Sequence, residues 1–161
     1  MNPNYKDNEY IKMAAENFGA ERSEENLYRL FDVLLKRMLD NGEAPAAMVD
    51  VNNAMPAIDL ENLDEGDTFK LDREVRLRLD KVGRGDGVEW IPLYTDEEEL
   101  SKQPTTNLTM NVSIESILYN GLSENVAGIV INPFGIALTV PKEILNIVIR
   151  RYEEISGGEE P

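Results

Sequence analysis

Apolar side chains near the N-terminus recur at the three- and four-residue spacing of amphipathic α-helices. A short helix is predicted over residues 6–18, before the natural stop Gly19, with an apolar face made of Ile11, Ala14, Ala15 and Phe18. Ser23 is a suitable N-cap for a second, stronger helix that ends at Gly42. The apolar stripe of this helix is made of Leu27, Leu30, Phe31, Leu34, Leu35 and Met38.

Short elements are expected next. The residues predict a strand over Ala46–Val51, an acidic stretch over Asn52–Asp67 with a helical turn near Asp59–Leu63, and a short strand over Thr68–Leu71. The turn is included because a wholly irregular connection of that length is uncommon in a compact domain.

A β-hairpin is the clearest local pattern in the middle of the chain. Apolar residues alternate with charged ones over Val75–Asp80, a Gly-rich turn follows at Gly83–Gly87, and Val88–Thr95 returns as the second strand. Pairing Val82 with Val88 sets the register of the whole hairpin.

This register divides the hairpin into two faces. The more apolar face, which we expect to point to the core, is made of Leu77, Leu79, Ile91 and Leu93. The other face gathers Trp90 and Tyr94 with Arg76, Arg78 and Asp80. Trp, Tyr and Arg dominate interface hot spots, so this face is a candidate partner surface if it is open. The alternative is that a helix covers it and the arginine stems pack over it.

Capping signals and β-branched runs predict the elements of the C-terminal half. They are a helix that Thr95 begins through a capping box with Glu98, a helix over Ile114–Asn120 capped by Ser113, strands over Val126–Ile131 and Ile136–Val140, and a largely buried helix over Lys142–Ile155 that Pro141 starts.

A tight turn connects the two C-terminal strands. In Asn132-Pro133-Phe134-Gly135, Asn accepts backbone donors, Pro pre-sets φ, and Gly closes the turn at a position where positive φ is expected. Phe134 at the tip is a further candidate contact residue.

These elements predict an α+β fold. We expect a mostly antiparallel sheet flanked by two N-terminal helices and a buried C-terminal helix. The chain is predicted to form one domain over residues 1–161, with a helical part at about 5–41, an α/β part at about 45–155 and a frayed tail at 156–161.

Charge narrows the class of partner. The chain has 16 Lys and Arg against 31 Asp and Glu, a formal net charge of −15. Such a surface repels nucleic acid and anionic membranes and attracts a basic protein. The N-terminus lacks a signal peptide, and the apolar run Val126–Pro141 is interrupted at Asn132-Pro133, so the cytoplasm is the expected compartment.

The residue types also limit the chemistry. With no Cys and no His, the chain can offer no disulfide, thiolate, imidazole base or soft zinc ligand. The acidic run Asp96–Glu99 suits a helix N-terminus better than a cation site, since consecutive helical side chains point to different faces. We therefore predict no catalytic residue, no metal and no cofactor.

Three pieces of the second half carry a family resemblance. They are Trp90–Leu100, Val126–Gly135 with its Ile-Asn-Pro-x-Gly turn, and Leu138 with the helix Pro141–Ile149. Together they resemble the N-terminal domain of the SseB family, named for enhanced serine sensitivity, over about residues 86–150. The resemblance implies a compact α/β domain without an implied reaction. SseB-like domains are also associated with candidate immunity proteins beside bacterial toxins.

The sequence therefore favours a non-enzymatic protein-interaction module. Its candidate contact residues are Trp90, Tyr94, Arg76, Arg78 and Phe134, and its signature turn is Asn132, Pro133 and Gly135. A toxin-immunity protein that binds a basic effector is the first alternative. A small-ligand-binding or carboxylate-based hydrolytic domain is the alternative from another class.

Overall fold

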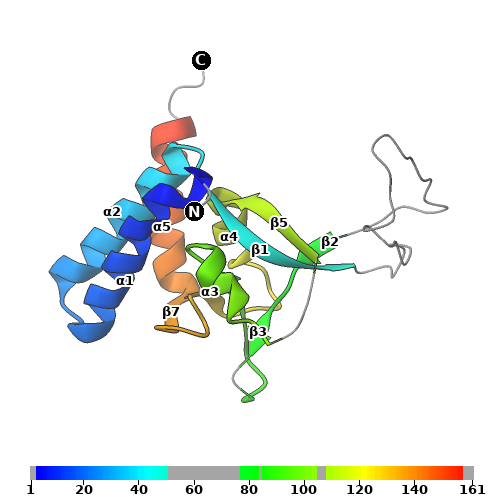
Figure 1. The fold of residues 1–161 in the computed structure, drawn as a ribbon. Helices are drawn as coiled ribbons and strands as arrows, with labels where there is room; N and C mark the ends of the chain where they lie inside the picture. The colour runs from blue at the N-terminus through cyan, green and yellow to red at the C-terminus, as the bar shows by residue number, and fades with distance from the viewer. Residues whose placement is uncertain (1–2, 51–76, 84, 105–107, 158–161) are drawn as a thin grey trace.

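The structure, a computed structural model, describes residues 3–50, 77–83, 85–104 and 108–157 (Figure 1). Its helices are η1 (Pro3–Asn8, a 3-10 helix), α1 (Glu9–Ala20), α2 (Glu24–Leu39), α3 (Glu97–Ser101), α4 (Ile114–Asn120) and α5 (Lys142–Gly157). Its strands are β1 (Glu43–Asp50), β2 (Leu77–Leu79), β3 (Val82–Gly83), β4 (Glu89–Leu93), β5 (Leu108–Ser113), β6 (Gly128–Ile131) and β7 (Leu138–Pro141). This composition confirms the predicted α+β class.

The described strands are divided between two sheets. In the first sheet, β1 lies between β2 and β5, and both pairings are antiparallel. The second sheet has the order β3-β4-β6-β7, with β4 and β6 parallel and the other pairs antiparallel. The predicted mostly antiparallel pairing is confirmed, but it is distributed over two sheets because β2 pairs with β1.

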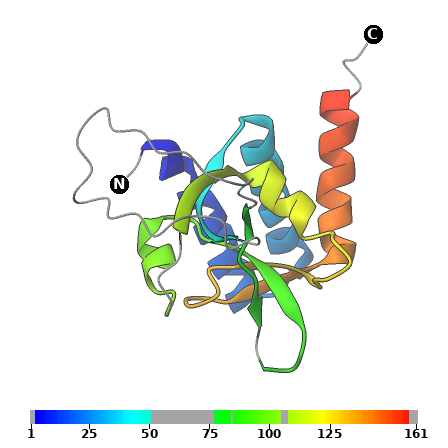
Figure 2. The same cartoon turned by 90° about the vertical axis from the view of Figure 1, so that its right-hand side faces the viewer.

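Helices α1, α2 and α5 pack together along one side of the molecule (Figures 1 and 2). The start of α2 was predicted correctly, since the Ser23 hydroxyl accepts a hydrogen bond from the Asn26 N–H at 3.1 Å. Both predicted stops were wrong in detail. Helix α1 continues one residue past Gly19, and Asn41, with φ of 58°, takes the left-handed position after α2 in place of Gly42.

The C-terminal helix is buried along one side. Leu145, Val148 and Ile149 join the hydrophobic core beneath the helical layer. Ile147, in contrast, is 56% exposed. The prediction of a buried C-terminal helix is thus confirmed for this side, whereas the side that carries Ile147 is part of the molecular surface, so the helix is less buried than expected.

The predicted hairpin forms only near its turn. Val82 pairs with Trp90, two residues away from the predicted partner Val88. Leu79 does not continue this hairpin and pairs with Met48 of β1. The chain between β2 and β3 passes from one sheet to the other, so the single apolar face and the single Trp–Arg face of the predicted hairpin are not formed.

The other short elements of the C-terminal half lie close to their predicted positions. Ser113 caps α4 by accepting a hydrogen bond from the Ser116 N–H at 3.1 Å. Strands β6 and β7 lie within or beside the predicted runs, and α5 begins directly after Pro141. The predicted frayed tail at 156–161 starts too early, because α5 includes Ser156 and Gly157. Predictions for Asn52–Asp67, for the turn near Asp59–Leu63, for Thr68–Leu71 and for residues 158–161 lie outside the described residues.

Candidate functional site

Trp90 and Phe134, both named from the sequence, line one small cavity on the outer face of the four-stranded sheet. Trp90 lies opposite Val82, and Val130 of β6 points to the same face because strand side chains alternate. The chain then turns after β6 and brings Phe134 to the cavity. The volume is about 70 Å³, and the lining residues are Val82, Gly83, Trp90, Val130, Pro133, Phe134 and Ala137.

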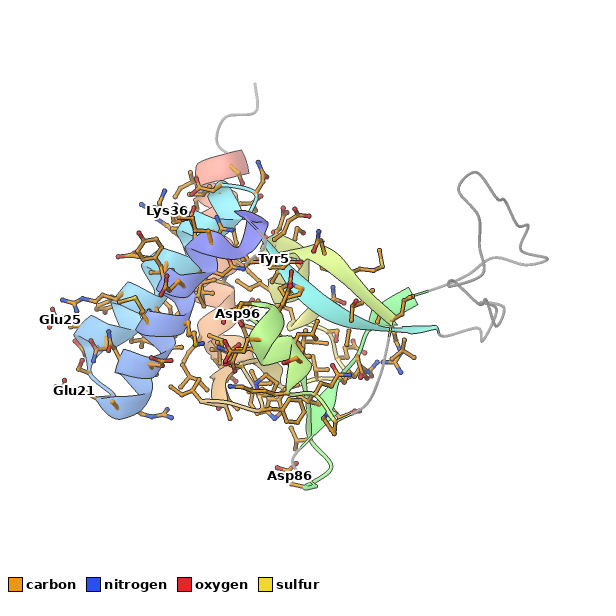
Figure 3. All side chains as sticks on the ribbon, viewed as in Figure 1. Tyr5, Glu21, Glu25, Lys36, Asp86 and Asp96 are labelled. Atoms are coloured by element: carbon orange, nitrogen blue, oxygen red, sulfur yellow. The ribbon has the colours of Figure 1, made fainter. Side chains whose placement is uncertain are left out.

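This Trp90–Phe134 cavity is open to the surface. Phe134 is 42% exposed and Trp90 is half-buried. The cavity lies at the base of the β3–β4 hairpin, whose tip projects from the body of the molecule at Asp86 (Figure 3). An exposed aromatic residue beside a shallow apolar hollow is the arrangement in which a partner side chain becomes buried on binding.

The other predicted contact residues lie elsewhere. Tyr94 is only 1% exposed, and its burial, together with the charge of Asp80, raises its pKa to about 12. Arg78 is exposed but belongs to the three-stranded sheet, where it pairs with Val49. Arg76 lies outside the described residues. The structure thus brings Trp90 together with Phe134, which were predicted as separate contact residues, and places Arg78 in the other sheet.

The signature turn is organised by Asn132, which is 1% exposed and has φ of 48°. Its carbonyl oxygen accepts hydrogen bonds from the N–H groups of Gly135 and Ala137, both at 2.9 Å. Its side chain binds Thr95 twice: Oδ1 accepts from the Thr95 N–H and Nδ2 donates to the hydroxyl, each at 3.0 Å. The turn therefore ties the end of β6 to the end of β4.

Two details of this region were predicted wrongly. The positive φ angles fall on Asn132 and on Ala137, at 54°, and not on Gly135. The helix after β4 is capped by Asp96, whose Oδ1 accepts from the Glu99 N–H at 2.9 Å, and not by Thr95. Thr95 is engaged by Asn132 instead, so the N-cap moves one residue along the chain, and the Glu99 side chain does not close a capping box because its Oε2 faces Lys102 and Lys12.

The buried carboxylate of Glu99 was not predicted from the sequence. Glu99 is 3% exposed, and its Oε2 lies 2.7 Å from the Lys102 Nζ and 3.4 Å from the Lys12 Nζ of α1. Its Oε1 has no hydrogen-bond partner among the residues described. A Cβ on Gly135 would come within 2.5 Å of this oxygen, which explains why glycine suits that position. The i,i+3 spacing of Glu99 and Lys102 was the available signal, but it does not reveal burial.

This ionic cluster fits a structural role better than catalysis. Burial lowers the pKa of Lys12, but the charges of Asp96 and Glu99 outweigh burial, so the net shift is upward and the amine stays protonated. A protonated amine is not a nucleophile. The nearby Thr95 hydroxyl is held by Asn132. Within the described ranges, no group of three or more Asp and Glu side chains is placed to hold a metal ion.

A larger groove lies between α2 and α5. Its volume is about 640 Å³, and its lining residues are Tyr28, Phe31, Asp32, Leu35, Ile147, Val148, Arg150, Arg151 and Glu154. Tyr28 and Ile147 are 59% and 56% exposed at its rim. A second hollow, of about 470 Å³, lies on the other side of α2 beside Tyr10 and Arg37. The groove between α2 and α5 was not predicted, because the C-terminal helix was expected to be largely buried, whereas Ile147 on that helix is exposed.

Comparisons with known proteins give no further assignment. No protein-family model matches the chain, and no curated protein or solved structure matches it at a significant level. Among the helices described, none combines the length and the apolar character that crossing a bilayer requires. The resemblance to the SseB N-terminal domain stays a prediction of the sequence.

Proposed function

We propose that this protein is a non-enzymatic protein-interaction module that binds its partner at the Trp90–Phe134 cavity. The observation that supports this most directly is the convergence of Trp90 and Phe134, from separate segments, on one open apolar hollow. Phe134 is exposed although it is large and apolar, and it belongs to a turn that internal hydrogen bonds already hold in place. Such a preorganised aromatic residue loses little conformational freedom on binding.

The size of the cavity favours a protein partner over a small substrate. About 70 Å³ accommodates the end of one aliphatic side chain. Pockets for small molecules occupy about 300–1,000 Å³. A carboxylate-based hydrolytic site, the alternative from another class, has weaker support, since Glu99 is buried between two lysine side chains and packs on Gly135.

The charge of the chain favours a basic partner. A net charge of −15 accelerates the encounter with a cationic protein and has less influence on how long the complex lasts. An immunity protein that binds a basic toxin in the bacterial cytoplasm is the specific version that the SseB resemblance and this charge support together. Its association rate should fall steeply as salt is added, because salt screens long-range attraction.

Capture experiments with matched variants test the proposal. Tagged wild-type protein, Trp90→Ala, Phe134→Ala and the control Val88→Ala are each incubated with lysate of the native cell. Val88 is a 40% exposed apolar residue of the same hairpin that does not line the cavity. We expect at least one captured protein to fall about tenfold or more for both cavity variants and to persist with Val88→Ala.

Fluorescence separates loss of binding from loss of folding. Trp90 is the only tryptophan, so its emission reports on the cavity alone. The captured partner should protect it from a soluble quencher in wild-type protein and in Val88→Ala. A folded Trp90→Ala variant that captures the same proteins in the same amounts as wild type would refute the proposed site.

A further inference from the structure

The groove between α2 and α5 has the composition of a protein contact. Phe31 and Leu35 are half-buried and Val148 is buried along it, while Tyr28 and Ile147 stand at its rim with more than half of their surface exposed. Exposed apolar side chains that gather along a groove beside charged residues are typical of interaction sites on soluble proteins. The question is which occupant fits it.

The charges of the two helices differ from those of the rest of the chain. Helix α2 carries three basic residues, Arg29, Lys36 and Arg37, and three acidic residues, Glu24, Glu25 and Asp32. Helix α5 also carries three of each, namely Lys142, Arg150, Arg151, Glu143, Glu153 and Glu154. The net charge of −15 therefore resides outside these helices. A strongly basic partner gains little here, whereas another neutral surface can approach without local repulsion.

Among the residues described, two charged side chains on opposite walls of the groove have no ion-pair partner. Asp32 on the α2 wall and Arg150 on the α5 wall are exposed and form no ion pair with any residue described. The neighbouring charges are already paired, Arg151 with Glu154 at 3.2 Å and Lys36 with Asp40 at 3.0 Å. The groove thus has one free negative wall and one free positive wall.

We infer that the occupant of this groove is a second copy of the same chain. A two-fold axis along the groove places α2 of one copy over α5 of the other, so Asp32 faces Arg150 of the second copy and the contact occurs twice. The same rotation brings the two sets of Tyr28 and Ile147 together. A helix of another protein would need its own charges opposite Asp32 and Arg150, whereas a second copy of this chain supplies both.

The size of the surface sets the expected strength. Each helix has 16 residues and is therefore about 24 Å long, and two neighbouring helices cover roughly 500 Å² per copy. Stable complexes bury about 800 Å² per partner, so the dimer should be weak and dependent on concentration. The groove and the Trp90–Phe134 cavity share no lining residue, so contacts in the groove leave the residues of the cavity accessible.

Sedimentation velocity over a wide concentration range, at about 0.15 M salt so that the net charge of −15 on each copy is screened, tests the inference. Wild-type protein should shift from monomer to dimer, and Ile147→Asp should raise the dissociation constant more than about tenfold. Val88→Asp introduces the same charge at a similarly exposed apolar residue outside the groove and should dimerise like wild type. A wild type that stays monomeric, or a dimer that Ile147→Asp leaves intact, overturns the inference.

Reversing the charges of Asp32 and Arg150 tests the proposed pairing directly. Asp32→Arg alone places two positive charges opposite each other across the contact, and Arg150→Asp alone places two negative charges there, so each variant should be monomeric by itself. In a mixture of the two variants, each contact of a heterodimer pairs one positive with one negative side chain. The mixture should therefore form a dimer, although each variant alone does not. A mixture that stays monomeric while wild type dimerises refutes the proposed pairing. None of these variants touches the Trp90–Phe134 cavity, so this result is independent of the proposed function.

Discussion

Helices α1, α2 and α5 and the segment Leu77–Leu93 are stabilised over different distances along the chain. In a helix each backbone N–H finds its acceptor four residues earlier, and the Ser23 cap acts at an equally short range. The segment Leu77–Leu93 depends on distant partners. Leu79 pairs with Met48 in one sheet, and Leu93 pairs with Ile131 in the other.

Two backbone contacts show how firmly this segment is tied to the rest. The Asp80 N–H donates to the Ala47 carbonyl at 2.9 Å, and the Ala127 N–H donates to the Glu89 carbonyl at 2.9 Å. Because side chains alternate along a strand, a slip of one residue here would turn apolar side chains outward in both sheets. Substitutions in this region should therefore lower the free energy of unfolding strongly when they disturb a close contact between strands. Substitutions in the helical layer should have smaller effects.

The largest expected effect concerns Gly128 at the start of β6. Its φ is 149°, and a Cβ there would overlap the Val140 carbonyl oxygen of β7. Gly128→Val combines backbone strain with overpacking against a strand, so we expect a loss of about 4 kcal/mol in the free energy of unfolding. Urea denaturation measures this loss.

Two other glycines provide the comparison. Gly157→Val should change stability by less than about 1 kcal/mol, because nothing lies within 4 Å of its Cβ position. Gly135→Val should fall between the two, since the Glu99 carboxylate it meets is the end of a side chain and can move. Equal losses at Gly128 and Gly157 would contradict the close approach of β6 and β7.

The same difference in range explains what the sequence could predict. The stripe from Leu27 to Met38 and the caps at Ser23 and Ser113 are local signals, and the structure confirms them. The residues after β4 offer two possible N-caps, Thr95 and Asp96, each followed three residues later by a glutamate. The contact between Asn132 and Thr95 selects the second, and no local pattern encodes that contact.

The candidate site was predictable in its residues but not in its assembly. Trp90 and Phe134 were recognisable as large aromatic residues at a strand and a turn tip. Their meeting depends on the parallel pairing of β4 and β6, which a hairpin pattern cannot reveal. The burial of Glu99 and the exposure of Ile147 were missed for one reason: each follows from which neighbouring element covers that face of its helix.

The ionisation of Tyr94 should have an effect of intermediate size on the free energy of unfolding. Burial, with the charge of Asp80, raises its pKa to about 12, against about 10 in the unfolded chain. Between these values the unfolded state releases the Tyr94 proton and the folded state keeps it. The contribution of Tyr94 to the free energy of unfolding is therefore fully present below pH 10 and is lost as the pH rises towards 12. The two-unit shift corresponds to about 2–3 kcal/mol.

Tyr94→Phe removes this dependence. The stability difference between wild type and Tyr94→Phe should shrink between pH 9 and pH 11.5, as measured by urea denaturation at several pH values. Tyr119→Phe is the control, because Tyr119 also has a pKa raised to about 12 by burial and by Glu153 but is 36% exposed, so solvent screens it. A constant difference for Tyr94→Phe would show that Tyr94 is not buried in solution.

The smallest expected effect compares two helix caps, one in each region. The hydroxyls of Ser23 and Ser113 accept the Asn26 and Ser116 N–H groups at the same distance of 3.1 Å. If capping is a local interaction, Ser23→Ala and Ser113→Ala should each cost about 1 kcal/mol and the glycine variants only a few tenths. The midpoint of urea denaturation should shift without a change in slope. A loss of unfolding free energy at Ser113 several times that at Ser23 would mean that the cap of α4 also fixes the end of β5 against Glu43, its partner in β1. Ser113 would then contribute to both local and distant stabilisation.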